Sequence, residues 1–285
     1  MVHPKLTLEK RIEAELASYD GMVGIYVNDL KGNVIDINGE EVFETASSIK
    51  AFILACLYEE VEQGRKRLDD MLTCDERYYI NGSGLLRSLD MGVTLSVKNT
   101  AILMIIVSDN IATNMIIDYL GIDTINHFIK KTGFAHTVLH NPINFAIYPQ
   151  LGSSTPEDYG KFFELLAQGK LVSEHASEEM MEIFKKQHYN RMLTKDLPQY
   201  LLDSEDTGDE ELITVASKSG SMDACRIDGG IVSTPYGSYV IVLMHKKFHD
   251  PLYYADHQAT VYGAKISRLI FDQYMALEGR LRKEA

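Results

Sequence analysis

The chain has 285 residues, of which 45% are hydrophobic and 24% are charged. This length and composition suit one large domain, or two closely packed ones, with a substantial apolar core. The formal net charge is −13 at pH 7 and no basic stripe is visible, which excludes a general nucleic-acid-binding protein. No apolar stretch reaches the roughly 18 residues of a membrane-spanning helix, so none is predicted.

The three cysteines, Cys56, Cys74 and Cys225, match no zinc-binding spacing and show no pairing pattern. An odd number of unpaired cysteines favours a reducing compartment. The first residues lack the apolar core of a signal peptide. We therefore expect a cytoplasmic protein as the sequence is written, and an extracytoplasmic one if a leader has been removed. We expect a monomer, with no metal ion and no cofactor.

The predicted elements begin with a helix over residues 7–18 and two strands in 21–38 that turn at Lys31 and Gly32. A helix follows Ser47, and the pattern stays mostly helical to about residue 184. It is clearest in four segments: 97–110, 111–121, 122–133 and 155–169. The acidic run 203–211 is interpreted as a solvated loop. Strands follow in three segments, 212–220, 225–234 and 238–246, and a helix over 261–279 closes the chain.

This order of elements is explained most simply by a sheet that is interrupted by a helical insertion. The two ends of the chain would form one antiparallel sheet flanked by the terminal helices. We therefore predict an α/β domain made of residues 1–45 and 196–285, and an all-α domain made of residues 46–195.

Ser47 and Lys50 stand three residues apart just before an apolar helix, with Thr45 and Ser48 beside them. Small hydroxyl residues commonly cap helices, because their side chains bond the free N–H groups of the first turn. The same spacing also places a serine and a lysine on one face, close to the buried side of the helix. On this stretch alone, the pair is either a cap or a nucleophile with its base.

Two further triplets are unusual for their surroundings. Ser108-Asp109-Asn110 breaks an apolar helical run, and Lys218-Ser219-Gly220 lies within an apolar strand pattern. Taken singly, the first could cap the next helix and the second could form a bulge at a sheet edge. Together with the Ser47–Lys50 pair, in this order, they form the set S-x-x-K, S-D-N and K-S-G.

With this set, the sequence resembles the penicillin-recognising serine enzymes, most closely the class A β-lactamases. The resemblance extends over residues 82–121, 154–166 and 218–244, and in outline over nearly the whole chain. It implies a β-lactamase/transpeptidase-like fold, in which an antiparallel sheet flanked by helices carries an inserted helical domain.

The resemblance implies a role for each member of the set. Ser47 would be the nucleophile and Lys50 its base, since burial and a neighbouring Lys218 would lower the pKa of the Lys50 amine. Ser108 would carry a proton to the leaving nitrogen. The substrate would be held by Asn110 at its amide side chain, by Lys218 and Ser219 at its carboxylate, by Gly220 and Ser221 along the strand, and by the backbone N–H groups of Ser47 and Ser221 as an oxyanion hole.

The chain departs from the family at the Ω-loop. Class A β-lactamases carry a glutamate there, in an ExxLN motif, that activates the deacylating water. Here the corresponding stretch has no glutamate before Glu157, and Ile143 falls at the expected position in a loop about four residues shorter than usual. Three residues, His136, His140 and Asn144, are candidates for positioning the water instead.

We therefore predict a serine hydrolase that forms an acyl-enzyme through Ser47 on a β-lactam, amide or ester, with impaired deacylation. Loss of a general base typically slows a step by about 10²–10⁴-fold. The alternatives are a true class A β-lactamase with a substitute base, a D-alanyl-D-alanine peptidase or penicillin-binding protein, and a non-catalytic binding module. The expected partner is a small-molecule or peptide substrate, not a nucleic acid or a membrane.

Other side chains are candidates for binding or for ordinary structural roles. His245 and His249, with Asp250, are interpreted as surface residues rather than as a metal site, because they lie at a strand end. Arg226 would either bind a carboxylate or be a solvated strand arginine. Tyr78 and Tyr79 would either wall the cleft or pack ordinarily, which we favour.

Overall fold

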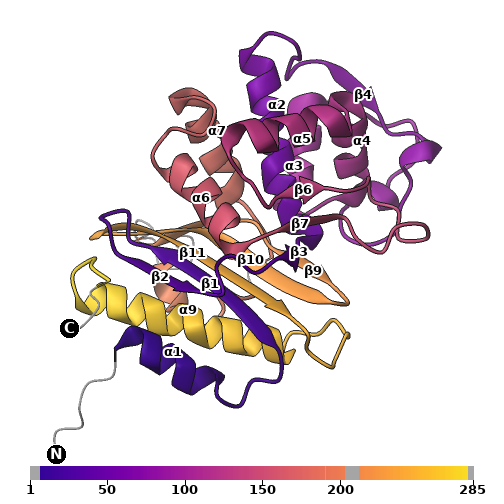
Figure 1. Ribbon diagram of the computed structural model, residues 1–285. Coiled ribbons are helices and arrows are strands. Elements are labelled where there is room, and N and C mark those ends of the chain that lie inside the picture. Colours follow the sequence, from indigo (N-terminus) through magenta and orange to yellow (C-terminus); the bar gives the residue numbers. More distant parts are fainter. Residues whose placement is uncertain (1–6, 190, 203–211, 282–285) are drawn as a thin grey trace, which may run out of the picture.

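The central feature of the protein, as seen in a computed structural model that describes residues 7–189, 191–202 and 212–281, is an antiparallel sheet. Its strand order is β2-β1-β11-β10-β8, and β9 also pairs with β10. Both ends of the chain supply it, as the sequence predicts (Figure 1). Its strands are β1 (Met22–Asn28), β2 (Val34–Ile37), β8 (Thr214–Ser217), β9 (Gly220–Met222), β10 (Cys225–Thr234) and β11 (Gly237–Lys246).

Helices cover both faces of this sheet. Helices α1 (Leu8–Leu16) and α9 (Gln258–Ala276) lie on one face, and α6 (Pro156–Ala167) packs on β1, β10 and β11 from the other (Figure 1). Along β11, Ile241 and Leu243 join the cluster beneath α9, whereas Val242 and Met244 join the other core. Because successive strand side chains alternate between two buried faces, β11 is apolar almost throughout.

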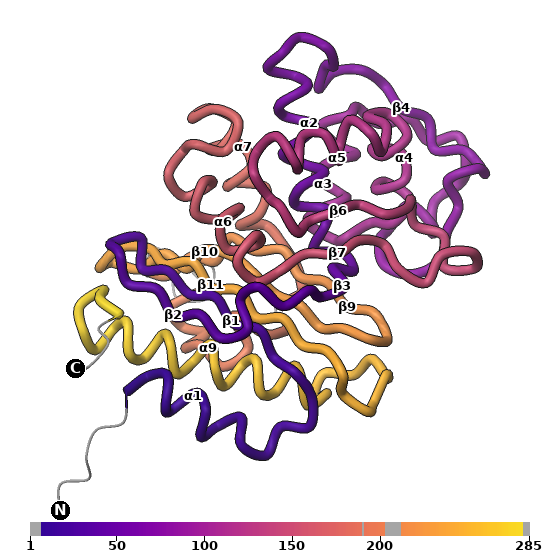
Figure 2. Tube along the Cα trace, in the orientation of Figure 1, coloured from indigo at the N-terminus to yellow at the C-terminus, as the bar shows by residue number. Residues whose placement is uncertain are grey.

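The second part of the molecule is helical. It contains α2 (Lys50–Glu62), α3 (Val97–Ile106), α4 (Asn110–Leu120), α5 (Ile122–Thr132) and α7 (Glu174–Lys185). Helix α2 is buried along most of its length, and the tube in Figure 2 shows it among the other helices. Its apolar side chains point in all directions, which is typical of a helix inside a core. The first residues of α2 are therefore held rigidly against the sheet and the other helices.

Short elements join these two parts. A small sheet has the order β3-β7-β6, and β4 pairs with β5. Their bounds are β3 (Phe43–Glu44), β4 (Met71–Thr73), β5 (Thr94–Ser96), β6 (Val138–Leu139) and β7 (Gly152–Ser154); the 3-10 helices are η1 (Ala46–Ile49), η2 (Glu76–Tyr78), η3 (Leu86–Ser88) and η4 (Gln199–Leu201). Elements of two to four residues are too short for a hydrophobic period to reveal them.

The predicted fold is confirmed, with one correction to its strands. The single strand expected over 212–220 is wrong, because β8 ends at Ser217 and β9 begins at Gly220, which leaves Lys218 and Ser219 at the break. The predicted domain boundaries stay a prediction, and the acidic run 203–211 lies outside the described residues. Within the described ranges, no helix is both long and apolar enough to cross a membrane.

His245 and Arg226, two polar residues whose roles the sequence left open, are both buried in the structure. His245 is fully buried, so its interpretation as a surface residue is wrong, whereas His249 is exposed. Arg226 is buried, so the alternative of a solvated strand arginine is wrong, and it lines the cavity described below. Its guanidinium donates to the backbone oxygens of Met222, Cys225, Pro251 and Leu252.

The remaining candidates are accounted for by packing or exposure. Tyr78 is buried and donates to Asp118, and Tyr79 is exposed. Neither lines the cavity described below. All three cysteines are buried and unpaired.

Candidate active site

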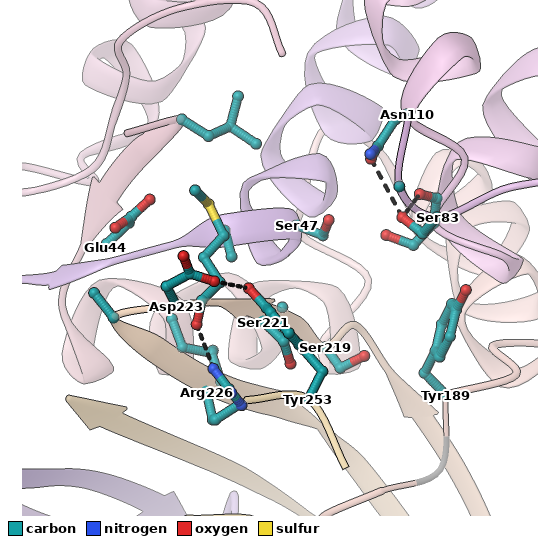
Figure 3. Close-up of a pocket in the computed structure, with 18 of the residues that line it drawn as sticks. Glu44, Ser47, Ser83, Asn110, Tyr189, Ser219, Ser221, Asp223, Arg226 and Tyr253 are labelled. Atoms are coloured by element: carbon teal, nitrogen blue, oxygen red, sulfur yellow. Dashed lines mark hydrogen bonds between the residues drawn. The ribbon is translucent and has the colours of Figure 1, made fainter. Parts of the chain in front are cut away.

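A cavity of about 850 Å³ contains most of the residues singled out from the sequence. Its walls come from η1, the start of α4, β9, the loop before β7 and the segment after α7. Figure 3 shows Ser47 near its centre, Asn110 above it and Ser219 and Ser221 below. The predicted residues that line it are Ser47, Ser108, Asn110, Ser219, Gly220 and Ser221. Lys50 and Lys218 lie just behind this wall, where both are fully buried and bond to Ser108.

Ser47 lies in η1, just before α2, and the capping alternative is wrong for it. No side-chain cap bond is found at the start of either η1 or α2. The preceding Ala46 has φ of 45°, a left-handed conformation that L residues adopt only when the surroundings enforce it. The Ser47 side chain remains partly exposed to the cavity, and no described group hydrogen-bonds its hydroxyl. It is therefore accessible to a ligand.

Strand β9 lies directly against η1 because residue 220 is a glycine. A Cβ atom at this position would lie 2.5 Å from the Thr45 oxygen, 2.7 Å from the Ser48 nitrogen and 2.9 Å from the Ser47 nitrogen. Any side chain would force the two backbones apart. Gly220 thus lets β9 lie close to η1, and the oxyanion hole formed by the Ser47 and Ser221 N–H groups stays a prediction.

The Lys50 amine is held by three groups from the S-D-N segment. Its Nζ lies 2.7 Å from the Ser108 carbonyl oxygen, 3.0 Å from Ser108 Oγ and 2.9 Å from Asn110 Oδ1. Burial lowers the pKa of Lys50 well below its usual value, and the charge of nearby Lys218 lowers it further, against an opposing effect of Asp109. Both effects favour the neutral amine.

The three partners suit a neutral amine. The Ser108 carbonyl and Asn110 Oδ1 can only accept, so they take the two N–H groups of an uncharged Lys50. Ser108 Oγ accepts a third N–H from a charged Lys50, whereas beside the neutral amine the serine hydroxyl can donate to the Nζ lone pair instead. The geometry therefore accommodates an amine with the basicity that a general base needs.

Lys218 approaches the same serine from the sheet. Its Nζ donates to Ser108 Oγ at 3.2 Å and to the Ser219 oxygen at 2.7 Å, and the buried Tyr159 hydroxyl donates to its carbonyl at 2.6 Å. Burial lowers the pKa of Lys218 to about 7, although the charge of Asp228 acts in the opposite direction. The Ser108 hydroxyl thus bridges the two lysines, as the resemblance implies.

The S-D-N segment caps helix α4 through Asp109 and lines the cavity through Ser108 and Asn110. Asp109 is the N-cap of α4 and accepts from the backbone of Ala112, while its other oxygen accepts from Leu85 and Leu86. Ser108 has φ of 51°, so the chain turns sharply there. Asp109 therefore fixes the backbone that presents Ser108 and Asn110.

One residue of this network was missed by the sequence analysis. Ser83 Oγ lies 2.7 Å from the Ser108 carbonyl oxygen and 3.3 Å from Asn110 Oδ1, and Figure 3 shows it beside Asn110. It also lines the cavity. The Gly82-Ser83-Gly84 triplet, a polar residue between two glycines of positive φ, was the available signal. Four charged residues that line the cavity, Glu44, Arg191, Asp223 and Asp228, were also missed.

The loop before β7 presents an apolar side chain to the cavity. Ile143 lines it and is only 4% exposed. Asn114 bonds its backbone on both sides: the Ile143 N–H donates to Asn114 Oδ1 at 2.8 Å, and Asn114 Nδ2 donates to the Ile143 oxygen at 2.9 Å. The three suggested substitutes, His136, His140 and Asn144, do not line the cavity. Both histidines are exposed, and His140 contacts Ser153.

Solved structures of β-lactamases and of PBP-A share this fold. A β-lactamase from Sphaerobacter thermophilus superposes with a TM-score of 0.81 at 26% identity, covering 95% of this chain and 97% of the other. PBP-A superposes with a TM-score of 0.81 at 25% identity, covering 97% of this chain and all of the other. The predicted resemblance is confirmed by these matches.

Two curated relatives are also β-lactamases. β-Lactamase BRO-1 of Moraxella catarrhalis is 23% identical over 67% of this chain and 63% of its own length. An imipenem-hydrolyzing β-lactamase of Enterobacter cloacae is 28% identical over 56% of this chain and 57% of its own. The matches thus span about three fifths of each relative. The predicted β-lactamase-like family is confirmed, because residues 7–274 match the β-lactamase enzyme family, and the chain belongs to it.

Proposed function

We propose that the protein forms an acyl-enzyme through Ser47 and releases it slowly, as a penicillin-binding or D-alanyl peptidase type of serine hydrolase. The observation that carries this proposal is Ile143. The loop wall of the cavity presents its apolar side chain with the backbone fixed by Asn114. The sec-butyl side chain of isoleucine cannot take a proton from water, so deacylation lacks a base at this position.

Acylation has the groups it needs. A neutral Lys50 takes the Ser47 proton as Ser47 Oγ attacks the substrate carbonyl, and the carbonyl π electrons move to its oxygen, which the Ser47 and Ser221 N–H groups would stabilise. When the intermediate collapses, the C–N bond breaks and the Ser108 hydroxyl delivers a proton to the leaving nitrogen. Ser108 is reprotonated by Lys50, to which it is already bonded.

One movement is needed for this step. In the substrate-free protein, the described bonds of Lys50 Nζ go to Ser108 and Asn110, and none joins it to Ser47 Oγ. Catalytic hydrogen bonds are often long or misaligned in the absence of substrate and tighten in the complex. A small rotation of Ser47 or Lys50 on binding is therefore part of the proposal.

The relatives support the formation of an acyl-enzyme. A PBP-A point mutant, which superposes at a TM-score of 0.81 and 25% identity, was solved as an acyl-enzyme complex with penicillin G. That fact belongs to PBP-A. Its similar fold makes penicillin G a suitable probe for Ser47 here.

The test is the intact mass of the protein after incubation with benzylpenicillin. We expect one added penicillin on Ser47, a burst of one equivalent and a slow second phase. Ser47→Ala should give no adduct, whereas Ser48→Ala should keep it, because the Ser48 hydroxyl bonds the Thr45 carbonyl instead of lining the cavity. A persistent adduct in Ser47→Ala would contradict the nucleophile, and rapid turnover without an adduct would favour a true β-lactamase.

A further inference from the structure

The loop 81–84 is bonded to the S-D-N segment through its backbone. The Asn110 N–H donates to the Ser83 carbonyl oxygen at 3.1 Å, and Asn110 Nδ2 donates to the Asn81 carbonyl oxygen at 3.1 Å. Figure 3 shows the Ser83 and Asn110 side chains next to each other at the upper edge of the cavity. The Ser83 hydroxyl is therefore presented to the S-D-N segment by a loop that the same segment holds.

Two glycines allow this loop to come so close. A Cβ atom at Gly82 would lie 2.5 Å from Asn110 Nδ2, and one at Gly84 would lie 2.3 Å from the Asp109 carboxylate. Both glycines also have φ near +110°, a conformation that L residues rarely adopt. The approach of the loop thus depends on the residues that flank Ser83 on each side.

The Ser83 hydroxyl and the Lys50 amine are bonded to the same two acceptors. The Ser108 carbonyl oxygen lies 2.7 Å from Ser83 Oγ and 2.7 Å from Lys50 Nζ. Asn110 Oδ1 lies 3.3 Å from Ser83 Oγ and 2.9 Å from Lys50 Nζ. Both Ser108 and Asn110 are buried, and a buried acceptor that loses its donor is costly.

This sharing bears on the movement that acylation requires. When Lys50 turns toward Ser47, its bond to the Ser108 carbonyl or to Asn110 Oδ1 has to lengthen or break. The Ser83 hydroxyl has one proton, which it can give to either of these acceptors. Whichever bond Lys50 gives up, Ser83 is able to replace it, while Lys50 keeps the other.

We propose that Ser83 is a positioning residue for the base, and that its hydroxyl replaces Lys50 at one of the shared acceptors while the amine turns toward Ser47. This role acts through Lys50 and needs no contact between Ser83 and the substrate. The inference rests on the proposed acylation of Ser47 and deepens it, because it names a residue that determines how readily the base leaves its resting bonds.

The same geometry links Ser83 to the protonation of Lys50. A charged amine bonds these acceptors more strongly than a neutral one, and the Ser83 hydroxyl competes with it for them. Removing the hydroxyl leaves both acceptors to Lys50, which favours the ammonium form and raises the pKa of the amine. Lys218 and Asp109, whose charges also act on this amine, stay unchanged.

The experiment measures the second-order rate of acylation of Ser47 by benzylpenicillin and by the small ester p-nitrophenyl acetate, between about pH 5 and 9. Ser83→Ala should slow both reactions about tenfold near neutral pH, the size of one hydrogen bond at a buried acceptor. It should also move the acidic limb of both pH–rate profiles to higher pH. Ser83→Thr, which keeps the hydroxyl, should restore most of the rate. Ser88→Ala is the matched control, because Ser88 is exposed and does not line the cavity.

Four results would overturn the inference while leaving the proposed function intact. These are wild-type rates in folded Ser83→Ala, a fall by the same factor at every pH, a fall for benzylpenicillin alone, which would indicate contact with the substrate, and a Ser83→Thr protein as slow as Ser83→Ala. Should Ser83→Ala fail to fold, Ser83→Cys takes its place, since a thiol is a weak donor. If neither substrate labels Ser47 in the wild-type protein, the proposed function falls and this inference with it.

Discussion

Two walls face each other across Ser47, and they differ in almost every physical respect. The wall made by α2, the S-D-N segment and Lys218 is polar, buried and densely hydrogen-bonded, with the Ser108 hydroxyl between two lysine amines. The loop wall presents Ile143, Phe145, Tyr148, Pro149 and Leu151. The first wall carries amines and a hydroxyl, which we propose transfer protons, whereas these five loop residues include no carboxylate, amine or imidazole.

The difference separates the two halves of the proposed reaction. Acylation uses a proton acceptor and a proton donor on the lysine wall, whereas deacylation needs a base on the side from which water would arrive. Burial lowers the pKa of both lysines, and the charge of Lys218 lowers the pKa of Lys50 further. The loop wall is equally well fixed, through Asn114, yet it holds an apolar group in place. Both walls are thus held in place by hydrogen bonds, and they differ in the polarity of the side chains that they present to the cavity.

The largest effect is expected from removing the amine of the lysine wall. Lys50→Met should slow acylation by benzylpenicillin by about 10²-fold or more, the loss typical of a missing general base. It should also lower stability, because the Ser108 carbonyl and Asn110 Oδ1 lose a buried donor at about 1–3 kcal/mol each. Stopped-flow acylation and thermal unfolding measure the two effects.

Lys130→Met is the matched control for this change. Lys130 is an exposed residue at the end of α5, away from the cavity, so acylation should keep its wild-type rate. Unchanged acylation in a folded Lys50→Met protein would contradict the base role.

Gly220→Ala should have the next largest effect, because it acts on the geometry of the lysine wall without changing its chemistry. The new methyl group would meet backbone atoms at 2.5 and 2.7 Å, which cannot rotate away as a side chain can. A shift of ~1 Å between η1 and β9 can cost ~10²-fold in rate. Wild-type acylation kinetics with an unchanged unfolding temperature would show that the two backbones have room to separate.

The sequence was sufficient to predict the fold and the lysine wall. The S-x-x-K, S-D-N and K-S-G triplets retain their order and spacing, and long helices such as α6 carry clear start signals in Thr155 and Pro156. The structure brings Ser47, Lys50, Ser108, Asn110 and Lys218 together as expected, although their catalytic roles stay a prediction.

What the sequence could not show depends on tertiary contacts. The α-helix expected at Ser47 begins instead at Lys50, after a 3-10 turn, because β9 packs against this segment through Gly220. His245 is buried at a strand end beside Gly263 of α9, a contact that no local pattern reveals. Glu44 went unnoticed for a similar reason, since its position in the cavity depends on the hairpin 222–225 beside it.

Ile143→Glu should give the loop wall the proton acceptor that it lacks. Because Asn114 fixes the backbone of this residue, the new carboxylate should face the cavity and shorten the lifetime of the benzylpenicillin acyl-enzyme by at least about tenfold, at some cost in stability for burying it. Ile143→Gln, which adds a polar group of the same size without a base, is the control. Equal lifetimes in the Glu and Gln variants would show that a carboxylate at this position does not act as the base.

The smallest expected effect is a pH dependence that belongs to the lysine wall alone. The pKa of Lys218 is lowered to about 7, so its positive charge is present below that pH and is lost above it. A substrate that carries a carboxylate should therefore be acylated a few-fold more slowly, at low substrate concentration, as the pH rises from about 7 to 9.

An activated ester without a carboxylate does not need this charge and should show no such decline, because a neutral Lys50 is favoured at higher pH. Measuring the second-order acylation rate of both substrates across this range separates binding by Lys218 from proton transfer by Lys50. A parallel decline for the two substrates would instead place the titration on the proton-transfer groups, and the carboxylate would then have to be bound by another cation of the cavity, of which Arg191 is the first to test.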